Sequence, residues 1–263
     1  MTSALRYEWV RLTTVRSTWW LIGVSVVAQG LLALVLTLSG TSHNEPLTVD
    51  SAALALSGGI GVVPPLIFVF MGLIGVFASG HEYRYGTIRA AVTAFPRRTD
   101  LWAAKVLVVA AAVAVVGGLL AAESVGIGLL VGGPSAGEVF TGPQMGRVAA
   151  GYVVFLVICA LFGLALGGMA RNVPAAIVLL ITVPMIIEGL ISLILGMEAF
   201  ESIRSVSAYL PFTAGERMMA VSSETPLDGG PAPLRPLAGG LVFTAYGAAL
   251  LALWGTLFNK RDA

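Results

Sequence analysis

The sequence predicts an all-helical membrane protein with six transmembrane helices. Hydrophobic residues make up 57% of the 263 positions, charged residues make up 11%, and the mean hydropathy is +0.91. A soluble domain usually carries about 25% charged residues, so this chain has too few to cover a soluble globule. Its apolar stretches are continuous and do not alternate at every second residue, which favours helices over the strands of a membrane barrel.

The number of spans follows from the length of these stretches. A helix crosses about 30 Å of hydrocarbon with about 20 apolar residues, and it satisfies all of its backbone polar groups internally. Six stretches are long enough: about 18–38, 54–79, 102–131, 148–170, 173–196 and 237–258. The first is too long for a signal peptide, and we expect it to be retained. No connecting segment is large enough to fold alone, so we predict one transmembrane domain over 1–263.

The basic residues indicate the orientation of the spans. Eleven of the 15 lysines and arginines fall in 1–17, in 80–105, between the fourth and fifth spans, or after the sixth span. The connections on the other side carry eight acidic residues. By the positive-inside rule, both termini are expected in the cytoplasm.

Several kinds of chemistry are excluded. The single cysteine, Cys159, rules out an internal disulfide and makes a cysteine-based metal site unexpected. The net charge of +1 leaves no basic surface for nucleic acid. Residues 133–137 match G-x-S-x-G but follow an apolar helix, and neither His43 nor His81 lies inside a predicted span. We therefore expect neither catalytic residues nor a bound metal.

The N-terminal segment 4–16 has an amphipathic pattern. Leu5, Trp9 and Leu12 fall on one helical stripe, while charged residues lie elsewhere. The segment is expected to form an interfacial helix in the headgroup layer. The alternative is a basic tail that only sets the topology.

The segment 80–105 carries most of the functional information. Thr87 can cap a short helix whose N-terminal end favours the Glu82 carboxylate, and Pro96 can end that helix. Lys105 is expected to snorkel from the first turns of the next span. Such a charged helix suits docking of a cytoplasmic partner, although a solvated hairpin fits the bare pattern equally well.

This segment resembles the loop between spans two and three of ABC-2 type permeases, the membrane subunits of ATP-binding-cassette transporters. The resemblance lies in Glu82-Tyr83-Arg84, then Gly86-Thr87, then Pro96-x-Arg98, with Lys105 inside the following apolar helix. The layout of six spans, an amphipathic N-terminal helix and a long segment before span six is also similar. The specific motif is confined to 80–105.

The resemblance implies a permease dimer, of identical or related chains, that works with two cytoplasmic ATPase subunits in a prokaryotic plasma membrane. Residues 82–92 would form the coupling helix that docks on the ATPase, and export would be the activity. The residues implied in coupling are Glu82, Tyr83, Arg84, Gly86, Thr87, Arg89 and Arg98. The chain has no G-x-x-x-x-G-K-[ST] phosphate loop, so ATP and Mg²⁺ would bind to the partner and this chain would bind no cofactor.

The same resemblance implies a transport pathway between spans two and five, with helices before span six forming an outer lid. Glu123 and Glu188 interrupt apolar helices, where an acid usually faces a cavity or a partner. The alternative is an acid at the outer interface that binds water or a loop. The candidate pathway residues are Phe68, Met71, Pro184, Met185, Glu188 and Glu123.

The prolines and apolar residues of this pathway each have two interpretations. Pro184 frees the carbonyl of Leu180, and Pro64-Pro65 would have the same effect in span two. Such kinks could serve gating, although proline is common in membrane helices. Phe68, Met71 and Met185 could contact an apolar substrate or simply pack.

Two other functions remain open from the sequence. One is an ion- or proton-driven carrier that uses Glu123 or Glu188. The other is a structural or regulatory membrane subunit, such as an immunity protein. The substrate is not specified by the sequence.

Overall fold

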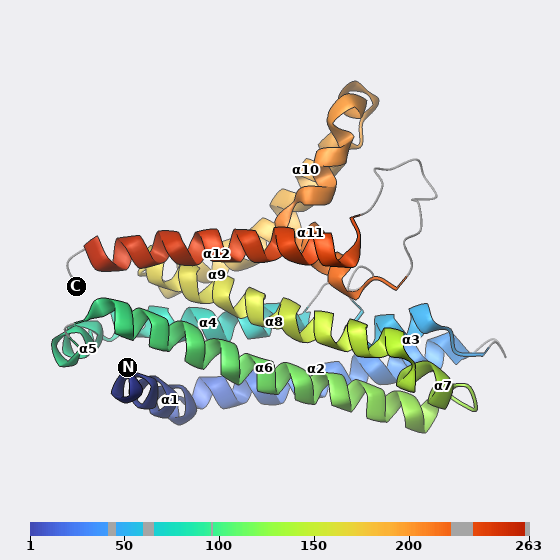
Figure 1. Ribbon diagram of the computed structural model, residues 1–263, viewed down its shortest axis with the longest axis horizontal. Helices are drawn as coiled ribbons and strands as arrows, with labels where there is room; N and C mark the ends of the chain where they lie inside the picture. The colour runs from blue at the N-terminus through green and yellow to red at the C-terminus, as the bar shows by residue number, and fades with distance from the viewer. Residues whose placement is uncertain (42–45, 60–65, 96, 222–233, 261–263) are drawn as a thin grey trace.

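The computed structural model describes residues 1–41, 46–59, 66–95, 97–221 and 234–260, and within these ranges every regular element is a helix (Figure 1). Six helical segments of this part are long and apolar enough to cross a membrane. They are α2 (Arg16–Thr41), α4 (Leu66–Arg84), α6 (Arg98–Val131), α8 (Pro143–Ala170), the segment Val173–Leu195 and α12 (Pro236–Lys260). The expected all-helical fold is confirmed, and so is the expected number of helices long and apolar enough to cross a membrane.

The second span is shorter than expected. Residues 49–56 form a separate helix, α3 (Val49–Leu56), which begins with a capping box made by Thr48 and Ser51. The spanning helix α4 then starts at Leu66 instead of residue 54. The expected break at Pro64-Pro65 lies outside the described residues.

The fifth span is interrupted at its proline. It consists of α9 (Val173–Thr182), one π-helical turn η1 (Val183–Ile187) and α10 (Glu188–Leu195). Because Pro184 has no N–H to donate, the regular ladder fails here, and the Glu188 N–H bonds to the Val183 carbonyl five residues back. In Figure 1, α10 leaves the bundle at an angle to α9.

The centre of the bundle is the contact between α4 and α8, where two glycines allow the backbones to touch. A Cβ atom at Gly75 of α4 would stand 1.8 Å from the Ala160 carbonyl oxygen of α8. A Cβ atom at Gly163 of α8 would stand 1.9 Å from the Gly72 carbonyl oxygen of α4. Small residues at such positions are the usual means by which membrane helices pack closely.

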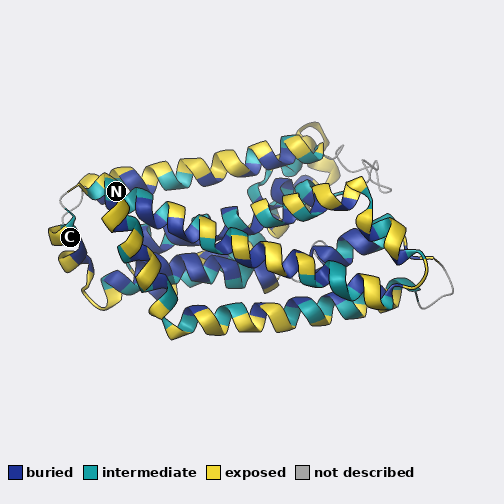
Figure 2. Cartoon of the chain, turned by 60° about the horizontal axis from the view of Figure 1, so that its bottom comes forward, coloured by how far each residue is buried: buried dark blue, intermediate teal, exposed yellow. Residues whose placement is uncertain are grey.

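Short helices connect α10 to α12. They are η2 (Glu198–Tyr209), α11 (Pro211–Glu216) and η3 (Arg217–Met219). Phe212 of α11 lies among the rings of Phe68, Phe162 and Phe243, with centroid distances of 5.4 to 5.5 Å. This aromatic group fixes α11 against α4, α8 and α12. Figure 2 shows the resulting pattern of buried residues inside the bundle and exposed residues on its outer faces.

Candidate functional site

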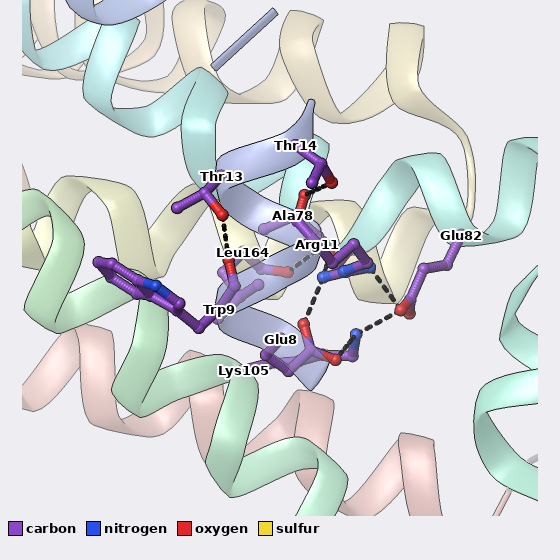
Figure 3. Close-up of polar contacts among 10 residues, drawn as sticks. Glu8, Trp9, Arg11, Thr13, Thr14, Ala78, Glu82, Lys105 and Leu164 are labelled. Carbon is purple, nitrogen blue, oxygen red and sulfur yellow. Dashed lines mark hydrogen bonds and ion pairs between the residues drawn. The ribbon is translucent and has the colours of Figure 1, made fainter. Parts of the chain in front are cut away.

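Three buried charged side chains and one partly buried arginine meet where α1, α4 and α6 come together (Figure 3). We call Glu8, Arg11, Glu82 and Lys105 the charged cluster. Lys105 Nζ of α6 lies 2.7 Å from Glu8 Oε1 and 2.6 Å from Glu82 Oε1. Arg11 pairs with Glu8 Oε2 at 2.5 Å and also with Glu82 Oε1. The cluster thereby joins the N-terminal helix α1 (Thr2–Thr14) to α4 and α6.

The cluster is electrically balanced and almost dry. Lys105 is 1% exposed, Glu8 and Glu82 are each 2% exposed, and Arg11 is 20% exposed. Burial raises the pKa of Glu8, and the neighbouring Lys105 and Arg11 charges oppose that rise. Two positive and two negative groups compensate one another here. Removing any one of them would leave an uncompensated charge in the interior, which is strongly destabilising.

The inward face of α1 differs from the predicted stripe. Ala4, Glu8 and Leu12, spaced four residues apart, are its buried positions, whereas Trp9 is 52% exposed. The pattern of apolar residues missed this face because its central residue is an acid. Lys105 likewise does not snorkel, since α1 lies over it and supplies Glu8.

The loop after α4 contains the expected short helix, which starts after Thr87 as its cap position predicts and not at residue 82 as the resemblance implies. Glu82 to Arg84 form the last turn of α4, and the separate helix is α5 (Ile88–Ala94). Gly86, at φ +70°, makes the turn between them, a conformation that favours glycine. Thr87 stands before α5 but makes no side-chain cap, and Pro96 lies outside the described residues.

The helix α5 is connected to α1, which carries two residues of the cluster. Ile88 and Ala91 are buried, and the Phe95 ring at the end of α5 lies 5.5 Å from the Tyr7 ring of α1. The helices α4, α5 and α6 form a hairpin, which we call the α5 hairpin. Its two arms, α4 and α6, carry Glu82 and Lys105. Contacts of both arms with α1 therefore fix the position of the α5 hairpin.

The other predicted coupling residues are spread around this hairpin. The Arg171 guanidinium lies 5.2 Å from the centre of the Tyr83 ring, and Arg98 Nη1 donates to the Phe258 carbonyl at 3.3 Å. Arg84 and Arg89 are exposed, as is Thr87. These exposed residues are the ones available to a partner.

Four of the six candidate pathway residues line one cavity. Its volume is about 260 Å³, and Phe68, Pro184, Met185 and Glu188 form part of its wall. Met71 is instead fully buried in the core. Glu123 is also elsewhere, facing Gly30 of α2, and its Oε2 atom is buried without a hydrogen-bond partner among the described residues.

Glu188 ties the fifth span to α11. Its carboxylate accepts hydrogen bonds from the Phe212 N–H at 2.9 Å, the Thr213 N–H at 3.0 Å and the Thr213 hydroxyl at 3.1 Å. These donors stand at the start of α11, where backbone N–H groups have no partners within the helix. Glu188 thus binds a connecting segment and also lines the cavity.

Glu216 is a residue of this cavity that the sequence did not single out. Burial raises its pKa to about 7, the nearby Glu188 adds to the rise, and Arg217 opposes it. Its carboxyl group is therefore about half ionised near neutral pH. No sequence signal marked Glu216, because it lies in a connecting segment with other acids.

Glu8 and Arg11 were not predicted as site residues, and their spacing of three residues on an N-terminal helix was the available signal. Within the described residues, no three His, Cys, Asp or Glu side chains lie together in a way that could hold a metal ion.

No protein-family model matches the chain, and a comparison with curated proteins finds no match.

Proposed function

We propose that this chain is the membrane subunit of an ABC-2 type transporter, in which two cytoplasmic ATPase subunits drive export through a pair of permease chains. The support is the order of elements: α1, six spans, α5 between the second and third spans, and short helices before the sixth. α1, α5 and the end of α12 lie at one end of the bundle (Figure 1). The distribution of basic residues along the chain favours this end as the cytoplasmic one, in a prokaryotic plasma membrane.

The observation that carries the proposal is the charged cluster. It holds α1 against Glu82 at the end of α4 and Lys105 near the start of α6, which are the two arms of the α5 hairpin. A partner that displaces α5 would therefore move α1, α4 and α6 together, because breaking a buried ion pair costs about 3–5 kcal/mol.

The helix α4 links this docking end to the cavity. Phe68, which lines the cavity, precedes Glu82 by 14 residues, a rise of about 21 Å along one helix. The wall of the cavity also contains Pro184, in the π-helical turn where the fifth span is interrupted. A movement of α4 relative to this broken span would change the shape of the cavity. That is the step by which ATP hydrolysis in the partner would act on a substrate.

Reversing the exposed charges near α5 should weaken partner binding. We expect the double substitution Arg84→Glu with Arg89→Glu to lower the amount of ATPase subunit recovered with the tagged chain about tenfold or more, since like charges would then oppose at the contact. The measurement is quantitative mass spectrometry after mild solubilisation of native membranes. The matched control is Arg235→Glu, an exposed arginine before α12. Equal recovery with the double variant and the control would contradict docking at α5.

A further inference from the structure

A second and larger cavity opens at the α1 end of the bundle. Its volume is about 540 Å³, and it lies between α1, the start of α2 and the last turns of α4. Among the residues of its wall are Leu12, Val15, Arg16, Ser17, Phe77 and Tyr85. None of the candidate pathway residues borders it, so it is separate from the cavity beside Glu188.

The wall formed by α4 changes from apolar to polar along its length. Phe77, His81 and Tyr85 follow one another at four-residue spacing, with ring centroids 4.5 Å apart for the first pair and 5.7 Å apart for the second. The rise from Phe77 to Tyr85 is about 12 Å. Phe77, Leu12 and Val15 are apolar residues of the wall, whereas Tyr85 lies beyond the end of α4. A ligand that fits this wall has an apolar end and a polar end.

The charge on the cavity wall that has no compensating partner is positive. Glu82 also borders the cavity, but Arg11 and Lys105 compensate its charge within the balanced cluster. Arg16 is exposed and forms no ion pair with any described residue. The Ser17 hydroxyl is buried and has no hydrogen-bond partner in the described part of the chain. Both residues stand at the N-terminus of the 26-residue helix α2, where the helix dipole also favours an anion.

We propose that this cavity binds one anionic phospholipid. The phosphate is held by Arg16 and Ser17 at the start of α2, and an acyl chain lies along Leu12 and Phe77. Basic recesses between membrane helices are suited to acidic headgroups. The site lies at the α1 end of the bundle, and it does not depend on the proposed ATPase partner. The bound lipid would fill the space between α1 and α4 and so support the contact on which the charged cluster depends.

Native mass spectrometry of the purified full-length chain tests this site. The chain is reconstituted in nanodiscs of phosphatidylcholine with phosphatidylglycerol and then released into detergent. We expect the wild-type chain to retain one phosphatidylglycerol in preference to phosphatidylcholine. Arg16→Gln should reduce that retention about fivefold or more, because one arginine near a headgroup contributes about 1 kcal/mol. The matched control is Arg97→Gln, an exposed arginine before α6 that does not line the cavity, which should retain the lipid as the wild type does.

Three results would overturn the proposal. Equal retention by Arg16→Gln and the wild type would show that Arg16 does not hold the lipid. Equal retention of phosphatidylcholine and phosphatidylglycerol would show that the cavity is an apolar groove that does not recognise the headgroup. Displacement of the lipid by millimolar inorganic phosphate would identify a site for free phosphate instead of a phospholipid. Because Arg16 makes no ion pair with a described residue, its substitution should leave folding intact.

Discussion

The substitution Lys105→Met is expected to destabilise the protein by about 3–5 kcal/mol, because it leaves two buried carboxylates with one guanidinium. Lys105 Nζ lies within 2.7 Å of Glu8 and Glu82, and both carboxylates are 2% exposed. The buried Cys159 provides the measurement, since it is the only cysteine in the sequence. A thiol-reactive fluorophore should label Cys159 at a markedly lower temperature in the variant than in the wild type.

Two further variants make this result specific to the cluster. Lys260→Met removes an exposed lysine at the end of α12 and should unfold at the wild-type temperature. Adding Glu8→Gln to Lys105→Met restores electrical balance between Glu82 and Arg11 and should recover a large part of the loss. Labelling of Lys105→Met at the wild-type temperature, or no recovery in the double variant, would contradict the structural role given to these ion pairs.

The substitution Gly75→Ala is expected to separate α4 from α8. The added methyl group would stand 1.8 Å from the Ala160 carbonyl oxygen and 2.7 Å from the Leu164 backbone nitrogen, and neither backbone atom can turn away as a side chain could. Overpacking of this kind costs about 1–3 kcal/mol, and we expect the upper part of that range. Labelling of Cys159 on the neighbouring α8 should again report the loss of packing.

Gly118→Ala is the matched control for this glycine. It lies in α6, and nothing stands within 4 Å of the position that its Cβ would occupy. Alanine is a better helix former than glycine by about 1 kcal/mol, so this variant should be neutral or slightly stabilised. Equal stability of the two alanine variants would show that α4 and α8 do not touch at Gly75.

The spans could be predicted because their signal is local. Hydropathy over about 20 residues is a property of each segment alone, and the residue count needed to cross a bilayer is fixed by geometry. The interruption at Pro184 could also be predicted, since proline removes a backbone hydrogen-bond donor wherever it occurs. The boundary at Leu66 was missed because the apolar run continues through α3.

The charged cluster could not be predicted in the same way, because its partners are distant in sequence. Lys105 lies 97 residues from Glu8, so no local pattern indicates that one covers the other. A lysine close to the start of a span, such as Lys105, is predicted from sequence to snorkel toward the headgroups. Lys105 is buried instead because α1 packs over it. The sequence predicts Glu82 as a docking residue, but its side chain is 2% exposed and anchors the hairpin. Arg84 and Arg89 are exposed and are the residues available to a partner.

ATP hydrolysis by the complex purified through this chain tests the proposed function most directly. The tagged wild-type chain is taken from its native membranes under mild conditions, and the release of phosphate from Mg-ATP is measured together with the identity of the co-purified chains. The account predicts a co-purified subunit with a phosphate loop and ATP hydrolysis that this subunit carries. Recovery of the chain without any nucleotide-binding subunit, together with pH-gradient-driven flux that Glu123→Gln abolishes, would contradict it and identify a carrier.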